Sequence, residues 1–206
     1  ARPQIPVVII DDDSGFRVLD HGMGDDLYVV IAASDWLIET VDGGIDTVQT
    51  ALDNYTLPAN LDKLVLTGSA SQRGFGNALD NVLQGGAGDD RLDGAAGTDT
   101  ARYDGASGTF TFARSGNTFT LTDVSAGEGV DVLTGIERLE FSDKSFELVN
   151  LPRTGVPAYG ANSGFLFDAV YYLLDNTELV PTLTRETALQ HYLSAGAAQG
   201  RDPNSW

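Results

Sequence analysis

Three consecutive nine-residue units between Gly76 and Arg102 carry the residues most able to do chemistry in this chain. They read GNALDNVLQ, GGAGDDRLD and GAAGTDTAR, and the middle unit fits G-G-x-G-x-D-x-U-x, with U apolar, at every fixed position. The first six residues of a unit predict a tight turn, where glycines allow carbonyl oxygens to converge. The sixth-position residues are Asn81, Asp90 and Asp99. Carboxylates stacked beside such carbonyls form an oxygen cage that suits a hard divalent cation such as Ca²⁺.

The last three residues of each unit predict the element that positions these oxygens. They form a short strand whose middle residue points inward, and these middle residues are Leu83, Leu92 and Ala101. The alternative is a set of glycine- and aspartate-rich surface turns that bind no metal. Because the period and the inward apolar residues agree, the pattern favours a parallel β-roll, in which successive units stack and share one core.

Similar turns and short strands occur on both sides of the repeats. G-x-G-x-D also ends at Asp26 and Asp131, and a degenerate form ends at Asp46. Runs rich in Val, Thr, Phe and Leu separate the turns. The sequence therefore predicts a mainly β fold, with residues 10–150 as one right-handed parallel β-roll or β-solenoid. We expect the region 110–121, with its turn at 115–117, to be a hairpin that closes the roll.

The character of the chain changes near residue 150. Prolines and glycines in residues 151–162 predict a linker. Residues 163–206 predict a short α-helical appendage, in which Ser163 caps a helix through Leu166 and Leu174, and Thr184 caps a second helix. Gly196 is placed to end that second helix.

The strongly negative net charge argues against some classes of binding partner. The 206 residues include 30 acidic and 12 basic ones, a formal net charge of -18. A phosphate backbone needs a basic face, so this charge argues against nucleic acid and equally against anionic membrane surfaces. Aspartates crowd beside glycines and should repel one another without bound cations. We therefore expect calcium to drive folding.

The absence of cysteine fits an exported protein, and the hydropathy predicts no membrane span. The chain has no cysteine, so disulfides cannot stabilise it, and metal is one other route. Its apolar runs are far too short for a membrane span, and no secretory signal peptide is visible. The opening ARPQIP is typical of a linker, which suggests a fragment of a longer protein.

The order of these motifs resembles a known family. The segments GDDLYVV at 24–30, IDTVQ at 45–49, LVLTG at 64–68 and GIERLEFSD at 135–143 accompany the nonapeptides. Residues 22–148 thereby resemble the haemolysin-type calcium-binding proteins, the RTX group. Residues 163–206 resemble a short helical repeat of bacterial exported proteins, which implies little about activity.

The resemblance implies where the ions would bind. In the family, a calcium ion lies between turns two units apart on the same side of the roll. Carried over, the turn 76–81 pairs with 94–99, and the turn 85–90 pairs with 67–72 before it or with the segment around Asp104 after it. The implied ligands are Gly76, Asn81, Gly85, Gly86, Gly88, Asp90, Gly94, Gly97, Asp99 and Asp104, with Asp26 and Asp46 as a further pair. Asn81 is neutral and Gln72 replaces an aspartate, so two or three sites are expected rather than one per turn.

The resemblance also implies a setting. Such proteins are secreted bacterial proteins that leave through type I secretion machinery and fold in extracellular calcium. The repeats accompany another domain, so we expect a non-catalytic module. A second hypothesis is an adhesin-like module that binds a surface polysaccharide or a partner. An enzyme is the least favoured class, because the chain has no G-x-S-x-G elbow and no H-E-x-x-H zinc motif.

Overall fold

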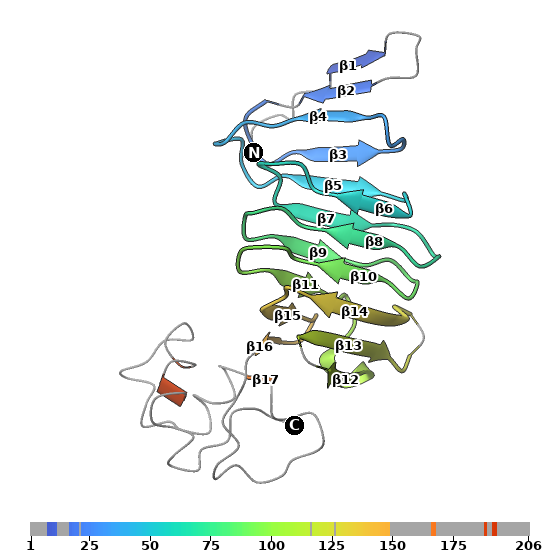
Figure 1. The fold of residues 1–206 in the computed structure, drawn as a ribbon, viewed down its shortest axis with the longest axis vertical. Coiled ribbons are helices and arrows are strands. Elements are labelled where there is room, and N and C mark those ends of the chain that lie inside the picture. The colour runs from blue at the N-terminus through green and yellow to red at the C-terminus, as the bar shows by residue number, and fades with distance from the viewer. Residues whose placement is uncertain are drawn as a thin grey trace.

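The chain winds into a parallel β-solenoid, as predicted. The computed structural model describes residues 8–11, 17–20, 22–115, 117–125, 127–148, 166–167, 188 and 191–192. Within them, short strands alternate between two facing sheets and stack along one axis (Figure 1). The mainly β fold expected from the nonapeptide pattern is thereby confirmed.

Eight strands form the longer sheet, in the order β17-β16-β15-β11-β9-β7-β5-β3. Strands β3, β5, β7, β9, β11 and β15 pair with one another in parallel. Strand β16 pairs antiparallel with β15, and β17 pairs antiparallel with β16. Their bounds are β3 Leu27–Val30, β5 Thr47–Thr50, β7 Lys63–Leu66, β9 Val82–Gln84, β11 Thr100–Arg102, β15 Arg138–Glu140, β16 Ser145–Leu148 and β17 Leu166–Phe167.

Six strands form the facing sheet, in the order β12-β13-β14-β10-β8-β6, and three more extend the solenoid toward its N-terminal end in the order β1-β2-β4. The six-stranded sheet contains β6 Asn54–Thr56, β8 Arg73–Phe75, β10 Arg91–Asp93, β12 Phe110–Ser115, β13 Thr118–Asp123 and β14 Val130–Thr134. The three-stranded sheet contains β1 Val8–Asp11, β2 Arg17–Asp20 and β4 Trp36–Ile38, and a single 3-10 turn spans Ser107–Thr109.

The core is a column of inward residues from the strands of the two main sheets. In the eight-stranded sheet, Val48, Leu64, Leu83, Ala101 and Leu139 stand in register. Each of them has no exposed surface. In the facing sheet Leu92 is 1% exposed. The three residues that the repeats predicted to point inward therefore do so, and their burial supplies the hydrophobic stabilisation of the coils.

The predicted hairpin is present and interrupts the coils. Strands β12 and β13 pair antiparallel, with Ser115 opposite Thr118. After it, β14 returns to the stack and pairs parallel with β10, so that Leu133 lies beside Leu92. The insertion is packed by a cluster of aromatic rings whose centroids lie 5.0–6.0 Å apart, formed by Tyr103, Phe110, Phe112, Phe141 and Phe146.

Beyond residue 148, the structure describes only residues 166–167, 188 and 191–192. The linker 151–162 and most of the helical appendage 163–206 lie outside the described residues. At Leu166 the predicted first helix is wrong, because Leu166–Phe167 is a strand that pairs antiparallel with β16. Ala188 and His191 have helical backbone, which falls within the second predicted helix. Across the described part of the chain, no helix is long and apolar enough to cross a bilayer.

Candidate metal centres

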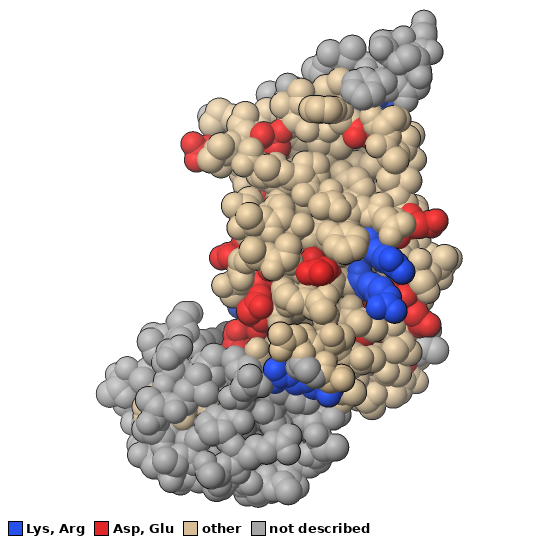
Figure 2. All heavy atoms as spheres, viewed as in Figure 1, with Lys and Arg blue, Asp and Glu red and all other residues tan. Residues whose placement is uncertain are grey.

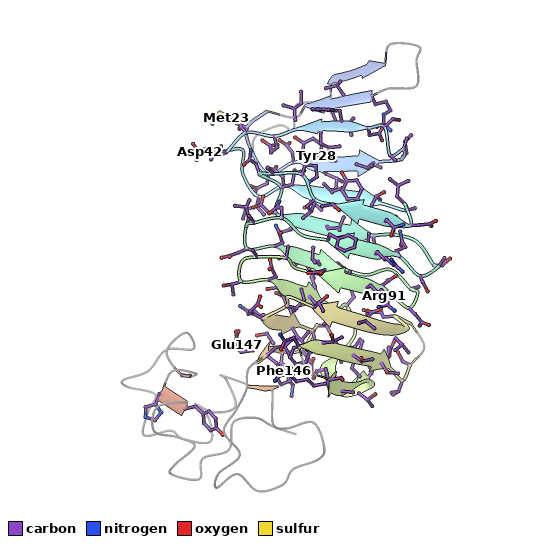
Figure 3. The ribbon with its side chains drawn as sticks, viewed as in Figure 1. Met23, Tyr28, Asp42, Arg91, Phe146 and Glu147 are labelled. Carbon is purple, nitrogen blue, oxygen red and sulfur yellow. The ribbon has the colours of Figure 1, made fainter. Side chains whose placement is uncertain are left out.

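The turns between strands form two stacks, one along each edge of the sheets. The first turn stack leads into the eight-stranded sheet and contains residues 22–26, 42–46, 60–62, 76–81, 94–99 and 135–137. The second turn stack contains residues 67–72, 85–90 and 127–131. In Figure 3, Met23 and Asp42 mark the edge of the first stack and Arg91 follows the second.

Side-chain hydrogen bonds link consecutive turns of each stack, with a break in the first stack between Asp62 and Asn81, where Asn81 Oδ1 accepts from the Asn77 N–H instead. The carboxylate that ends one turn accepts a hydrogen bond from the backbone N–H at the equivalent position of the preceding turn, which turns the carboxylate inward. We call this the carboxylate ladder. Its first-stack bonds join Asp26 N to Asp46 Oδ1 (2.9 Å), Asp46 N to Asp62 Oδ2 (2.8 Å), Asn81 N to Asp99 Oδ1 (2.8 Å) and Asp99 N to Glu137 Oε2 (2.8 Å), and its second-stack bonds join Gln72 N to Asp90 Oδ1 (2.7 Å) and Asp90 N to Asp131 Oδ1 (2.8 Å).

The structure brings together the turns 76–81 and 94–99, the pair implied by the resemblance. The Ala96 N–H donates to the Asn77 carbonyl at 3.4 Å, and the Gly76 N–H donates to the Asp93 carbonyl at 2.8 Å. Asp99 is fully buried between them, and its Oδ2 atom has no hydrogen-bond partner among the described residues. A buried, unsatisfied carboxylate oxygen is costly, which fits a site whose remaining ligand is a cation.

For the turn 85–90, the structure shows which turns lie next to it. The Ala87 N–H donates to the Gly68 carbonyl at 3.1 Å, so the turn 67–72 precedes it. Asp131 follows it and its Oδ1 accepts from the Asp90 N–H. Asp104 is instead largely exposed, and its Oδ2 accepts a 2.9 Å bond from Gln84 Nε2. The structure therefore puts Asp131, rather than Asp104, on the ladder.

The predicted glycines line these turns because the next turn leaves no room for a side chain. A Cβ on Gly94 would run into the Gly135 carbonyl oxygen and lie 2.5 Å from Asp99 Oδ2. A Cβ on Gly86 would run into the Gly68 carbonyl oxygen. The others behave alike: a Cβ on Gly76, Gly88 or Gly97 would lie 2.5 Å from the carbonyl oxygen of Gly94, Ala70 or Leu79, and one on Gly85 would lie 2.7 Å from Asp90 Oδ2. Carbonyl and carboxylate oxygens thus converge at each predicted turn.

A three-carboxylate cluster lies in the irregular first coils. Oxygen atoms of Asp26, Glu39 and Asp46 all lie within 4.8 Å of one another. Tyr28 OH holds Glu39 Oε2 at 2.6 Å, and the Asp26 N–H holds Asp46 Oδ1. The predicted pair Asp26 and Asp46 is therefore brought together, with Glu39 as a third acidic group. Oxygen donors of this charge and spacing could hold a divalent cation.

Burial opposes ionisation of the ladder carboxylates. It raises the pKa of Asp46 to about 6, against the hydrogen bond from Asp26 and with the charge of Glu39 adding to the rise. Burial likewise raises the pKa of Asp99 to about 6 and of Asp131 to about 7, and the neighbouring charges of Glu137 and Asp90 add to these shifts. A bound cation would reverse this balance by favouring the charged form.

We expect the metal-free protein to lose stability as pH rises. The ordinary pKa of these aspartates is 3.8, so between pH 4 and 7 the folded state binds more protons than the unfolded state. Their contribution is present in full below pH 3.8 and is lost as pH rises through the folded values of about 6 to 7. Thermal melting in EDTA should show a lower midpoint at pH 8 than at pH 5. A midpoint that rises over this interval would contradict the assignment.

Four acidic residues of the ladder or cluster were not among the predicted ligands: Glu39, Asp62, Asp131 and Glu137. Asp131 carried a signal, because it ends an intact G-x-G-x-D. The hairpin separates it from Asp90 by 41 residues, which breaks the nonapeptide period. Glu39 and Asp62 belong to coils without that period, so spacing alone could not find them.

Comparison with known proteins gives one partial relative. No family model matches the chain. Over 67 residues, 32% of this chain, it is 42% identical to the endo-1,3-1,4-beta-glycanase ExsH of Rhizobium meliloti (strain 1021). That match spans 14% of the length of the glycanase. The chain thus shares a stretch of sequence with a glycanase and is built as a β-solenoid whose turns converge on buried carboxylates.

Proposed function

We propose that this chain is an RTX-type, non-catalytic calcium-binding module of a larger exported bacterial protein. The observation that carries the proposal is the convergence of buried carboxylates with backbone carbonyls in stacked turns. Asp46 Oδ2 and Asp99 Oδ2 are buried without a hydrogen-bond partner among the described residues. Both belong to turns that glycines keep open for carbonyl oxygens of the adjacent turn.

The donor chemistry favours Ca²⁺ over other ions. The set contains carboxylate and carbonyl oxygens and, because the chain has no cysteine, no thiolate. Ca²⁺ accepts six to eight oxygen ligands in flexible geometry, whereas Mg²⁺ needs a near-ideal octahedron and retains its water. Irregular cages built from two stacked turns meet the first requirement better than the second.

The ion would act on folding rather than on a reaction. In a calcium-poor cytoplasm the ladder carboxylates stay unpaired and repel, so the chain remains unfolded and fit for type I secretion machinery. Outside the cell, Ca²⁺ binds the folded turns and pulls the equilibrium toward the solenoid. The partial match to the glycanase ExsH supports a setting in which such a module accompanies an enzyme.

The proposal is tested by calcium titration calorimetry on three single variants. Asp99→Asn and Asp46→Asn each remove one charge from a predicted site with little change in shape. Each should lower the number of bound ions or weaken one class of site about tenfold or more, because hydrogen bonds and contacts to charged groups are the strong ones. Asp104→Asn is the matched control, since its carboxylate is exposed and bonded to Gln84, and it should bind as the wild type does.

Equal binding by all three variants would contradict the proposed sites. Loss of ions in Asp104→Asn alone would move the second-stack site to that residue. Absence of any calcium heat in the wild type, together with an unchanged fold, would overturn the metal function itself.

A second candidate function is binding of an extracellular polysaccharide. The observation that favours it is the 67-residue match to a glycanase. Calcium binding and glycan binding are compatible, because the turns and the outer sheet faces are separate surfaces.

A further inference from the structure

Two arginines stand side by side on the outer face of the six-stranded sheet. Arg73 on β8 and Arg91 on β10 are register partners in the parallel pair. Both are exposed, and the residues beside them, Gly74 and Leu92, are buried. Adjacent strands lie about 4.8 Å apart, so the two side chains rise from neighbouring points of one face. Figure 2 shows basic side chains gathered into a compact patch on this side of the roll.

This pair is unusual in so acidic a chain. Like charges directly opposite on a sheet destabilise it. Among the described residues, no carboxylate forms an ion pair with either guanidinium. Repulsion between the two guanidinium groups therefore destabilises the fold, and no counter-ion among the described residues offsets it. An external anion that both guanidinium groups contact would remove that repulsion, and a carboxylate presents two oxygens for this purpose.

The residues around the pair suit a sugar. Asn54 stands in register beside Arg73, and Thr56 stands beside Phe75, so an amide, a hydroxyl and an aromatic ring share the face with the two arginines. Phe75 is 36% exposed and lies two residues, about 6.6 Å, along the strand from Arg73. Asp93 lies beside Phe75 and its Oδ1 accepts the Ala95 N–H at 3.0 Å. A sugar whose ring stacks on Phe75 could place its carboxylate on the two arginines, so that it contacts all three side chains at once.

We propose that Arg73, Arg91 and Phe75 bind a carboxylate-bearing sugar residue of an extracellular polysaccharide. The proposal deepens the second candidate function, on which it rests, by naming the face and the sugar class. The arginines hold the carboxylate, and Phe75 stacks against the apolar face of the ring. The turn aspartates repel an anionic polymer from the edges of the roll, whereas the sheet face presents the two arginines, with the Asp93 carboxylate beside Phe75.

The test uses trigalacturonate as the probe and its carboxyl-reduced trimer as the neutral counterpart. Binding to the full chain is measured by calorimetry and by amide chemical shifts, under conditions in which circular dichroism shows the chain folded. We expect the charged probe to shift amides of β8 and β10, with affinity that falls as NaCl is raised. The reduced trimer should bind at least about tenfold more weakly, as loss of a charge-assisted contact implies.

Variants separate this face from the rest of the molecule. R73Q/R91Q should lower affinity for trigalacturonate about tenfold or more, and Phe75→Ala should weaken it without removing the salt dependence. Arg102→Gln is the matched control: Arg102 is exposed on the opposite sheet, 4.0 Å from Asp104, and its loss should leave binding unchanged.

Two results would overturn the site. Undiminished binding by R73Q/R91Q would show that the probe binds elsewhere on the chain, for example through Ca²⁺ held by turn carboxylates. Equal affinity for the reduced trimer would show that the carboxylate is not recognised. Failure of the calcium proposal is distinguishable, because a chain that folds without Ca²⁺ still presents this face and can be titrated in EDTA.

Discussion

Excess EDTA at pH 8 is expected to abolish most of the β-sheet circular dichroism of this protein, and Ca²⁺ is expected to restore it. This pH is above the raised pKa values of Asp46, Asp99 and Asp131, so these carboxyl groups are ionised and the metal-free fold would bury several charges. One ion at 100 times its Kd stabilises the fold by about 2.7 kcal/mol. Two or three ions would thus supply an amount comparable to the total stability of an ordinary domain, about 5–15 kcal/mol.

The measurement is a Ca²⁺ titration of the EDTA-stripped chain, with Mg²⁺ at equal concentration as the control. Recovery of β signal with Ca²⁺ alone is the expected result. A chain that keeps its full β signal in EDTA and melts at the same temperature with and without Ca²⁺ would mean that the core column alone stabilises the solenoid. Equal recovery with Mg²⁺ would mean that divalent cations neutralise the turn carboxylates non-specifically and do not occupy sites selective for Ca²⁺.

Gly94→Ala is expected to be among the most damaging single methyl additions to the solenoid. Its Cβ would meet a backbone carbonyl, that of Gly135, and would also press on the Asp99 side chain at 2.5 Å. Neither can move without displacing the adjacent coil. Overpacking of this kind costs roughly 1–3 kcal/mol. The substitution would also displace Asp99 from its place in the site, so the midpoint gained on adding Ca²⁺ should shrink.

Gly108→Ala provides the matched control. A Cβ there would have no heavy atom within 4 Å, and its backbone lies outside the left-handed region. Its free energy of unfolding should change by less than about 1 kcal/mol, in the stabilising direction if at all, because alanine restricts the unfolded chain. Calorimetric melting of both variants with Ca²⁺ and with EDTA checks the pair. Equal midpoints for Gly94→Ala and the wild type would show that the turns separate easily.

The regular part of the fold could be predicted because one period encodes both its elements. Leu83, Leu92 and Ala101 repeat every nine residues, and each is buried as that period requires. The hairpin was also predictable, since two β-rich runs flank a Ser-Gly-Asn turn. Asp99 and Asp90 could be named as candidate ligands for the same reason: the sixth position of a unit always follows the turn.

The rest depended on contacts that no local pattern encodes. Asp131 enters the ladder only because β14 resumes the register of β10 after a long insertion. Asp104, in the segment that was an alternative partner for the turn 85–90, lies where the chain leaves the coil for the hairpin. The spacing around Leu166 predicts a helix, yet Leu166 pairs with β16, a tertiary contact that outweighs local propensity.

The carboxylate ladder has a consequence for how the ions interact with one another. Each rung joins a donor N–H of one turn to an acceptor oxygen of the next, so Asp90 both accepts from Gln72 and donates to Asp131. Fixing one carboxylate therefore orders the backbone that shapes its neighbour. The roll then resembles a one-dimensional lattice with nearest-neighbour coupling, in which occupancy spreads from filled sites to adjacent empty ones. If the turns bind Ca²⁺ as proposed, this coupling would make loading steeper than independent sites of the same affinity would give.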